Sequence, residues 1–211
     1  TGCDDQGCHG GALFIDSGCA VVANDCIFMN NIAGYSGGAV TLFEGAYLVS
    51  TDNVFISNTA DNGGVMYAYR GNIIVESCSF DSNLAHSDGG VLYAYAGSHI
   101  SVSNSSFESS EADDGGVAYA WSSNVSVDNS SFTNIKSRYD GGVICAYSGS
   151  ITVVSDSSFD INVAGDDGGV FYASSSNFTV ENSSFYGNRA GYRGGVAYAR
   201  NSNAKFTILF R

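Results

Sequence analysis

The sequence predicts an all-β fold, a single-stranded parallel β-helix (solenoid) of about eight rungs. Gly-Gly pairs recur along the chain at intervals of 26 or 27 residues, and strict repetition of this length is typical of solenoids. A run rich in β-branched and aromatic residues follows each pair, as in strands, and no stretch shows the period of a helix. The pairs are Gly10-Gly11, Gly37-Gly38, Gly63-Gly64, Gly89-Gly90, Gly115-Gly116, Gly141-Gly142, Gly168-Gly169 and Gly194-Gly195.

Each repeat is expected to hold two or three short strands. The first follows the Gly-Gly pair, as in VMYAY at residues 65–69, and the second is an alternating run such as IIV at residues 73–75. Rungs stacked about 4.8 Å apart can bury together the apolar side that one rung cannot bury alone. A phenylalanine column follows the second run: Phe28, Phe55, Phe80, Phe107, Phe132, Phe159 and Phe185.

The chain of 211 residues is expected to form one domain. Its composition, with 44% hydrophobic and 14% charged residues and no proline, is that of a packed protein. Within this domain we expect a Cys-rich N-terminal rung or cap over residues 1–36 and regular rungs over residues 37–211. Residues 205–211 read as an apolar strand without a cap, an edge that favours pairing with a further rung or another subunit.

Alternation along a strand predicts which side chains face the core. The second position after each Gly-Gly pair is apolar and faces inward. The fifth position mixes Asp16, Trp121 and Arg200 with aromatic residues, so it faces outward, and the third position then faces outward too. The result is two adjacent aromatic ladders on one outer surface: Tyr67, Tyr69, Tyr93, Tyr95, Tyr119, Trp121, Tyr147, Tyr172 and Tyr198. These rings either stabilise the sheet by stacking or form a binding face.

Aspartate precedes the Gly-Gly pair in four successive rungs, at Asp88, Asp114, Asp140 and Asp167. Like charges one rung apart repel, so donors or a cation must lie near them. Calcium suits such oxygen ligands and is the one candidate cofactor. The preferred interpretation, however, is that each aspartate caps its own turn by accepting backbone N–H bonds.

A column of Asn and Asp lies three residues before the phenylalanine and is followed by Ser-Ser in the later rungs. Side chains stacked in this way can hydrogen-bond from rung to rung, so a structural role is the simplest interpretation. The column also creates acceptor sequences for N-glycosylation, with two more elsewhere in the repeats. Their asparagines are Asn104, Asn124, Asn129, Asn177 and Asn182.

Four of the six cysteines, Cys3, Cys8, Cys19 and Cys26, fall in the first 26 residues. Their spacing matches no zinc pattern well, so disulfides that pin the N-terminal end are the preferred interpretation. Disulfides favour a secreted, cell-surface or other oxidising, lumenal location. Cys78 and Cys145 lie inside the repeats and read as small buried thiols.

The net charge of −13 arises from 21 acidic residues against 8 Lys and Arg. Such a field repels phosphate, so nucleic acid and anionic lipid are poor partners, whereas cations and basic proteins suit it. No apolar run is long enough to cross a bilayer, so no transmembrane segment is predicted.

The repeated G-G-[AV]-x-Y-A and F-x-x-N elements resemble the polymorphic outer-membrane protein repeats of chlamydiae and similar β-helix repeats of protists and algae. F-x-x-N is intact at residues 28–31, 55–58, 80–83, 159–162 and 185–188, and degenerate after Phe107 and Phe132. The resemblance covers nearly the whole chain. It implies a right-handed parallel β-helix of the pectate-lyase-like class and a role in surface display or adhesion.

Catalysis is not expected. Polysaccharide lyases and hydrolases need acidic groups that converge in a cleft, whereas the regular repeat spacing leaves no insertion to build cleft walls, and His9, His86 and His99 are scattered. The leading hypothesis is a non-catalytic scaffold that mediates protein or cell-surface contacts, as a subunit or segment of a larger assembly. The alternative is a carbohydrate-binding or carbohydrate-processing protein. Ice binding ranks below both, because the threonines do not align in columns.

Overall fold

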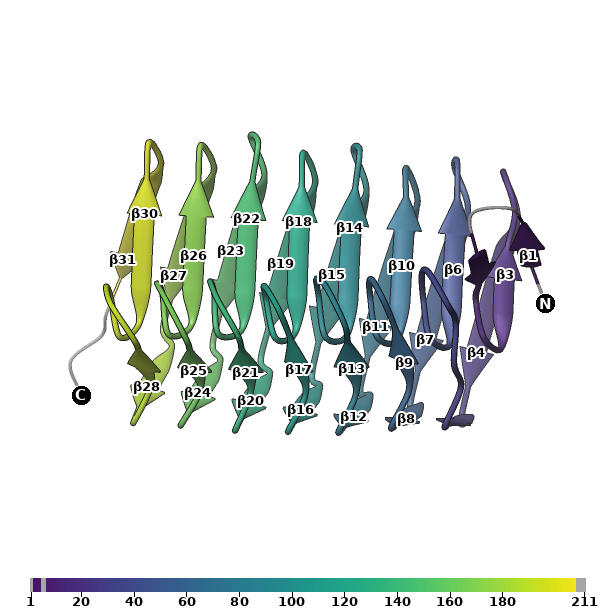
Figure 1. Ribbon diagram of the computed structural model, residues 1–211, viewed down its shortest axis with the longest axis horizontal. Coiled ribbons are helices and arrows are strands. Elements are labelled where there is room, and N and C mark those ends of the chain that lie inside the picture. Colours follow the sequence, from purple (N-terminus) through teal and green to yellow (C-terminus); the bar gives the residue numbers. More distant parts are fainter. Residues whose placement is uncertain (1, 5–6, 208–211) are drawn as a thin grey trace.

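The computed structural model describes residues 2–4 and 7–207, and their side chains from residue 8 onward. The chain winds into a stack of eight coils (Figure 1). Four parallel β-sheets run along the stack, and none of the described residues lies in a helix. The predicted parallel β-helix of about eight rungs is therefore confirmed. No helix that could cross a membrane occurs in this described part.

The first two sheets have eight strands each. The first sheet contains the strands that follow the Gly-Gly pairs: β3 (Leu13–Ile15), β6 (Val40–Phe43), β10 (Met66–Tyr69), β14 (Leu92–Tyr95), β18 (Ala118–Trp121), β22 (Ile144–Tyr147), β26 (Phe171–Ser174) and β30 (Ala197–Arg200). The second sheet contains the alternating runs: β4 (Ala20–Asn24), β7 (Tyr47–Thr51), β11 (Asn72–Glu76), β15 (His99–Ser103), β19 (Asn124–Asp128), β23 (Ile151–Ser155), β27 (Asn177–Glu181) and β31 (Asn203–Thr207).

The third sheet carries the phenylalanine column on seven strands: β5 (Ile27–Met29), β8 (Val54–Ile56), β12 (Ser79–Asp81), β16 (Ser106–Glu108), β20 (Ser131–Thr133), β24 (Ser158–Asp160) and β28 (Ser184–Tyr186). The fourth has six two-residue strands: β9 (Thr59–Ala60), β13 (Leu84–Ala85), β17 (Glu111–Ala112), β21 (Lys136–Ser137), β25 (Val163–Ala164) and β29 (Arg189–Ala190). Most rungs thus hold four strands rather than the expected two or three. The additional short strand lies between the phenylalanine and the next Gly-Gly pair, and it points an alanine such as Ala60 or Ala85 into the interior.

Equivalent residues of successive rungs stand directly above one another, as in the pairing of Phe80 with Phe107. The phenylalanine rings lie fully inside from Phe55 to Phe159. Neighbouring rings are stacked almost parallel, with centroids 4.6 Å apart for Phe80 and Phe107 and 4.8 Å apart for Phe132 and Phe159. Each stacked pair adds about 0.5–1.5 kcal/mol beyond the burial of its area, so this column is a continuous spine of the core.

The asparagine of F-x-x-N forms a second internal ladder beside the phenylalanines. Asn58 and Asn83 are buried. The side-chain amide of Asn58 donates to the carbonyl of Phe28 and to Oδ1 of Asn83, each at 3.0 Å. The backbone N–H of Asn58 donates to the same Oδ1 at 2.9 Å. The motif is therefore a structural device that satisfies buried polar groups between rungs.

The N-terminal segment begins with a two-stranded antiparallel sheet of β1 (Gly2–Asp4) and β2 (Gly7–His9). Cys8 is disulfide-bonded, and in the backbone register it stands opposite Cys3. The side chain of Cys3 lies outside the described residues, so its pairing stays a prediction.

The prediction that Cys19 and Cys26 take part in disulfides at this end is wrong, because both thiols are free and exposed. Extended strand β4 lies between the two cysteines and separates them along the chain. Five residues of strand span about 16 Å, whereas the Cα atoms of a disulfide lie within about 7 Å of each other.

Each Gly-Gly pair meets two separate requirements. The first glycine adopts a φ between +60° and +69° in every rung, a left-handed conformation that side chains disfavour. The second glycine packs against the next rung, where any Cβ would overlap the carbonyl oxygen of the second glycine there. At Gly116, for example, a Cβ would lie 2.5 Å from the carbonyl oxygens of Gly142 and Lys136. The repeat therefore depends on glycine at both positions.

We expect Gly116→Ala to lower the free energy of unfolding by more than about 4 kcal/mol, because backbone from two rungs would have to move. Gly34→Ala is the matched control, since a Cβ there would lie 3.7 Å from the amide nitrogen of Cys8, an ordinary contact. Chemical denaturation of both variants measures the difference. Equal midpoints would show that the glycine column does not constrain rung spacing.

Other corners of each rung also use a left-handed residue. Asn104 and Asn129 have φ values of +51° and +43°, a conformation that Asn and Asp adopt more readily than most residues. Ile161 occupies such a corner at a φ of +53°, which is unfavourable for a β-branched residue. Asn30 and Asn134 hold the same corner in other rungs.

The corner at Ile161 provides a test of this backbone constraint. Ile161 and Ile151 are both 47% exposed, but Ile151 lies in strand β23 and is not among the residues with positive φ. Changing either residue to Asn replaces an isoleucine side chain of equal exposure by the same polar side chain. We expect Ile161→Asn to be more stable than Ile151→Asn by at least about 1 kcal/mol, the cost of a left-handed residue. Thermal unfolding of the two variants measures this, and the opposite order would contradict it.

Candidate functional site

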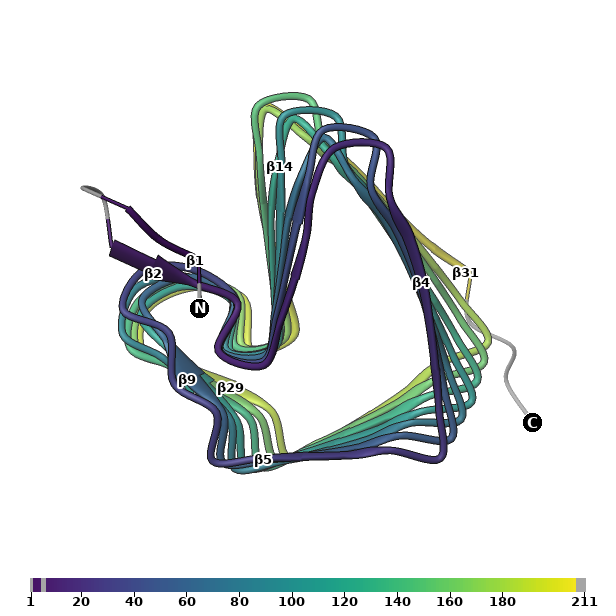
Figure 2. The same cartoon turned by 90° about the vertical axis from the view of Figure 1, so that its right-hand side faces the viewer.

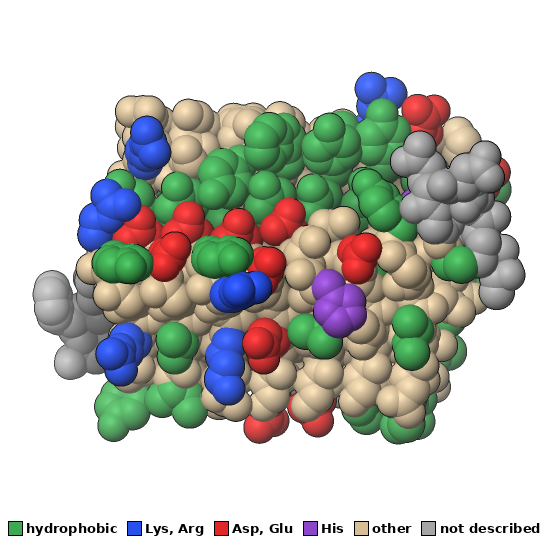
Figure 3. All heavy atoms as spheres, viewed as in Figure 1, with side chains coloured by type: hydrophobic (Ala, Val, Ile, Leu, Met, Phe, Trp, Pro, Cys, Tyr) green, Lys and Arg blue, Asp and Glu red, His purple; other side chains and the backbone are tan. Residues whose placement is uncertain are grey.

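The predicted aspartate and tyrosine columns meet on one face of the molecule. Before each Gly-Gly pair the chain folds back beside the first sheet, which gives the cross-section a notch (Figure 2). Contact across the notch is close, since a Cβ on Gly63 would lie 3.2 Å from Cβ of Tyr93. Figure 3 shows a row of acidic side chains next to the hydrophobic side chains of this sheet. We call this surface the acidic–aromatic face: Tyr67, Tyr69, Asp88, Tyr93, Tyr95, Asp114, Tyr119, Trp121, Asp140, Tyr147, Asp167, Tyr172 and Tyr198.

The predicted stacking of the aromatic ladders is present. Ring centroids are 5.1 Å apart for Tyr67 and Tyr93, and 5.0 Å apart for Tyr93 and Tyr119. In the fifth-position ladder, Tyr95 and Trp121 are 36% and 40% exposed. These rings project from the surface in register and are held by the strands beneath them.

The expectation that the third position faces solvent is wrong for the middle of the ladder. Tyr119 and Tyr172 are only 7% and 8% exposed, and Cys145 between them is fully buried. With Tyr93, Tyr147 and Tyr198 they form a small second core outside the main one. Alternation correctly directs these side chains away from the main core. They are buried nevertheless, because the chain folds back beside the first sheet and packs against them.

Cys145 interrupts the third-position ladder and changes how its neighbours pack. Tyr147, from the fifth position of the same strand, leans across the small thiol. Its ring centroid lies 5.7 Å from that of Tyr119 and 5.5 Å from that of Tyr172. Burial raises the pKa of the Cys145 thiol well above its ordinary value, so this cysteine is a packing residue.

Two of the aspartates accept hydrogen bonds from the next rung. The backbone N–H of Asp140 donates to Oδ1 of Asp114 at 2.8 Å, and that of Asp167 donates to Oδ1 of Asp140 at 3.1 Å. The expected capping of each aspartate's own turn is therefore wrong for Asp114 and Asp140, because in a parallel stack the nearest N–H belongs to the following coil.

Burial and mutual repulsion weaken the acidity of this row. The pKa of Asp88 is raised to about 7 by desolvation and by the nearby carboxylates of Asp114 and Asp113, and no hydrogen bond offsets them. Desolvation likewise raises the pKa of Asp140 to about 6 despite the bond from Asp167. The pKa of Asp114 is also raised, chiefly by desolvation. Asp88, Asp114 and Asp140 are thus poorly solvated carboxyl groups, and none of them forms an ion pair with a described residue.

Arg193 ends the row, a feature that the sequence reasoning missed. It occupies the same position before the Gly-Gly pair as the aspartates, one rung beyond Asp167. Its Nε and Nη2 donate to the two carboxylate oxygens of Asp167 at 3.0 and 2.5 Å. Its Nη1 donates to the hydroxyl of Tyr198 at 2.7 Å, and its guanidinium carbon lies 4.2 Å from the centre of that ring. Its place directly before Gly194 in the repeat was the available signal.

No group of three or more His, Cys, Asp or Glu side chains placed to hold a metal ion occurs among the described residues. Calcium binding by the aspartate column stays a prediction. The three histidines lie apart as expected: His9 ends β2, His99 begins β15 on the second sheet, and His86 follows β13 on the fourth.

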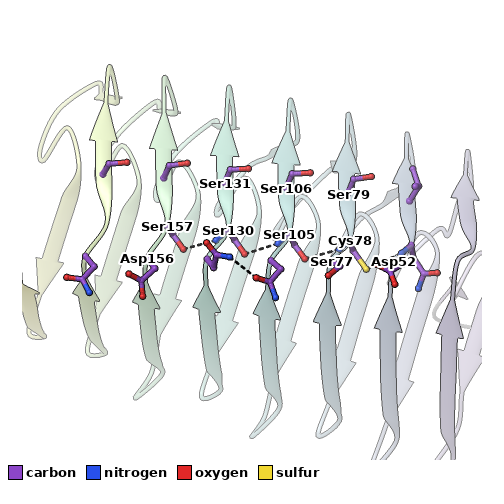
Figure 4. Close-up of a pocket in the computed structure, with 17 residues that line it drawn as sticks. Asp52, Ser77, Cys78, Ser79, Ser105, Ser106, Ser130, Ser131, Asp156 and Ser157 are labelled. Atoms are coloured by element: carbon purple, nitrogen blue, oxygen red, sulfur yellow. Dashed lines mark hydrogen bonds between the residues drawn. The ribbon is translucent and has the colours of Figure 1, made fainter.

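A second surface feature is a polar trough of about 640 Å³ along the corner between the second and third sheets (Figure 4). Its buried serines form a ladder in which each backbone N–H donates to the hydroxyl one rung on, as from Ser105 to Ser130 and from Ser130 to Ser157, both at 3.1 Å. The Ser130 hydroxyl itself donates to the carbonyl of Asp128 at 2.8 Å. Because these groups are already bonded, the structural interpretation of the Asn-Ser-Ser column holds. The asparagines of all five acceptor sequences are exposed.

The model of the family described as "Right handed beta helix region" matches residues 42–208. The chain belongs to this family. The right-handed parallel β-helix inferred from the repeats is thereby confirmed, while the narrower resemblance to polymorphic outer-membrane protein repeats stays an inference. No curated protein matches the chain. Right-handed β-helix regions share a scaffold, so the site must carry any functional argument.

The acidic row predicts an unusual dependence of stability on pH. The folded chain holds the proton on Asp88 up to about pH 7, whereas the group's ordinary pKa is 3.8. Between those values the folded state binds more protons than the unfolded state. The proton on Asp88 therefore stabilises the folded state fully below pH 4, and this contribution to the free energy of unfolding declines as the pH rises to about 7. We therefore expect Asp88→Asn to flatten the fall of the unfolding free energy between pH 4.5 and 7.5.

Denaturant titrations at several pH values measure this slope. Glu76→Gln is the control, because it removes an exposed carboxylate from the second sheet with the same change in net charge. An Asp88→Asn protein with the wild-type slope would contradict the prediction.

Proposed function

We propose that this right-handed β-helix is a non-catalytic scaffold whose acidic–aromatic face binds an extended segment of a partner protein. The observation that carries the proposal is the convergence of two columns on a single face: aspartates, of which Asp88, Asp114 and Asp140 form no ion pair with a described residue, and aromatic rings. From Tyr67 to Tyr198 the face covers five rung steps, about 24 Å at 4.8 Å each. An extended segment of about seven residues has that length.

The chemistry of the face favours a protein partner. Tyrosine and tryptophan offer large contact areas at low entropic cost, and they are enriched where proteins bind one another. The stacked rings are already fixed in register by the strands, so little ordering is needed on binding. The net charge of −13 attracts basic partners over a distance.

The absence of catalysis is part of the proposal. Glycosidase carboxyl groups face each other across a substrate, about 5–9.5 Å apart. Asp88, Asp114 and Asp140 instead follow one another along a single column, with Asp114 and Asp140 engaged by backbone N–H groups. A row of this kind attracts cations rather than activating a nucleophile.

We further propose a secreted or cell-surface location, with a role in display or adhesion. The bonded state of Cys8 supports an oxidising compartment. The resemblance of the F-x-x-N and G-G-[AV]-x-Y-A elements to chlamydial surface repeats supports the same role. The chain would then act within a larger assembly.

Carbohydrate binding is the second candidate. One observation favours it: the projecting rings of Tyr95 and Trp121 succeed one another along the axis, as platforms for sugar rings would. This candidate predicts binding to neutral glycans, on which the acidic row would have little influence.

A comparison of surface variants tests both candidates. Trp121→Ala and Tyr95→Ala remove exposed rings from the face, and Val153→Ala, which is 43% exposed on the second sheet, is the control. We expect purified basic proteins to bind the wild-type and control chains and to bind the ring variants at least about tenfold more weakly, the loss of about 1.4 kcal/mol. A glycan array measured with the same proteins gives the alternative its test. Binding of glycans but not of proteins would replace the first proposal by the second.

A further inference from the structure

The contacts of Arg193 show what kind of group this face accepts. Its guanidinium fills the end of the row with two hydrogen bonds to the Asp167 carboxylate, one to the Tyr198 hydroxyl, and the ring of Tyr198 beneath it. We infer that the acidic–aromatic face binds arginine side chains of an extended partner segment, at Asp88, Asp114 and Asp140, as Arg193 binds at Asp167. The inference rests on the proposed function and narrows it to one chemical class.

The register places the internal aspartates in the same column as Asp167 and Arg193. Asp167 pairs with Arg193 across one rung, and Asp88 pairs with Asp114 in the same column. Of these two pairings, only that of Asp167 with Arg193 places a cation against a carboxylate. None of Asp88, Asp114 and Asp140 forms an ion pair with a described residue, so a cation held there would come from a ligand.

Aromatic rings beside the row favour arginine over lysine. A guanidinium is planar, binds a carboxylate through two parallel hydrogen bonds and stacks on a ring, whereas an ammonium is a strongly hydrated point charge. The chain itself repeats this preference, because Arg70 lies over the Tyr69 ring at 5.0 Å. In the middle rungs Tyr119 and Tyr172 are buried, so the exposed rings of Tyr95 and Trp121 are the stacking surfaces for a ligand.

A peptide titration tests the inference. The probes are two capped peptides of alternating glycine and basic residues, one with arginine and one with lysine, added to the full chain at physiological salt. Trp121 is the only tryptophan in the sequence and lies on the face, so its fluorescence reports binding directly. We expect the arginine peptide to bind at least about tenfold more tightly than the lysine peptide.

Matched variants locate the site. We expect Asp114→Asn to weaken binding of the arginine peptide by about tenfold, the scale of one charge-assisted hydrogen bond. Glu76→Gln changes the net charge equally on the second sheet and is expected to have no such effect. Arg193→Ala frees the Asp167 carboxylate and is expected to strengthen binding. The Arg193→Ala variant leaves Asp88, Asp114 and Asp140 unchanged, so it still tests arginine recognition if Asp114→Asn does not fold.

Each contrary result has its own meaning. Equal affinity for both peptides, or equal losses in Asp114→Asn and Glu76→Gln, would overturn arginine recognition and leave a partner-binding face governed by charge alone. No binding of either peptide would also overturn it, while the protein and glycan comparison above would still decide the proposed function. Unchanged binding by Arg193→Ala would show that the contacts of Arg193 are not a pattern for ligands.

Discussion

The close approach of successive rungs at the Gly-Gly pair is the constraint on which the rest of the structure depends. At the second glycine the backbone of one coil lies where a Cβ would overlap the carbonyl of the next. The first glycine turns the chain through a left-handed conformation just before the strand starts. Together they fix both the spacing of the coils and the direction in which each new coil leaves the notch. Every column of side chains inherits its register from these two positions.

The notch that this turn creates explains why the molecule has two clusters of buried residues. The main core takes the phenylalanine and aliphatic columns, and the smaller one takes Tyr119, Cys145 and Tyr172 on the other side of the first sheet. Covering a tyrosine ladder in this way also brings a backbone turn beside it, and in four rungs that turn carries aspartate. Burial opposes the ionisation of Asp88, Asp114 and Asp140. Of the four aspartates, only Asp167 receives a cation from a described residue, Arg193. The acidic–aromatic face therefore arises from the way the chain turns before each Gly-Gly pair, and the repulsion between its carboxylates is offset by an arginine at one end.

Much of the fold could be predicted from the sequence because a parallel stack converts sequence period directly into spatial columns. The rungs, the inward apolar residues at the second position after Gly-Gly and the tyrosine columns followed from spacing and alternation alone. The burial of Tyr119 and Tyr172 did not, because alternation gives only the side of a strand and not what a distant turn places over it. The expectation that Cys19 and Cys26 take part in disulfides failed for a similar reason: cysteines that are close in sequence need not be close in space, and strand β4 separates these two. The Asn and Asp column was predicted to hydrogen-bond from rung to rung. Its positive φ values give a second reason for these residue types, which the sequence alone does not reveal.

Where the repeat departs from its own pattern is where the surface acquires individual chemistry. The phenylalanine column inside the core is the same residue in all seven rungs from Phe28 to Phe185, since a different side chain there would disturb the rings above and below. The fifth position, by contrast, changes from Tyr95 to Trp121 to Tyr147 without altering the strand beneath. Cys145 and Arg193 are similar departures, and each rearranges its neighbours on the same face. A regular scaffold with irregular residues on one face has the means to recognise a partner there, because specificity requires a pattern that the repeat alone cannot supply.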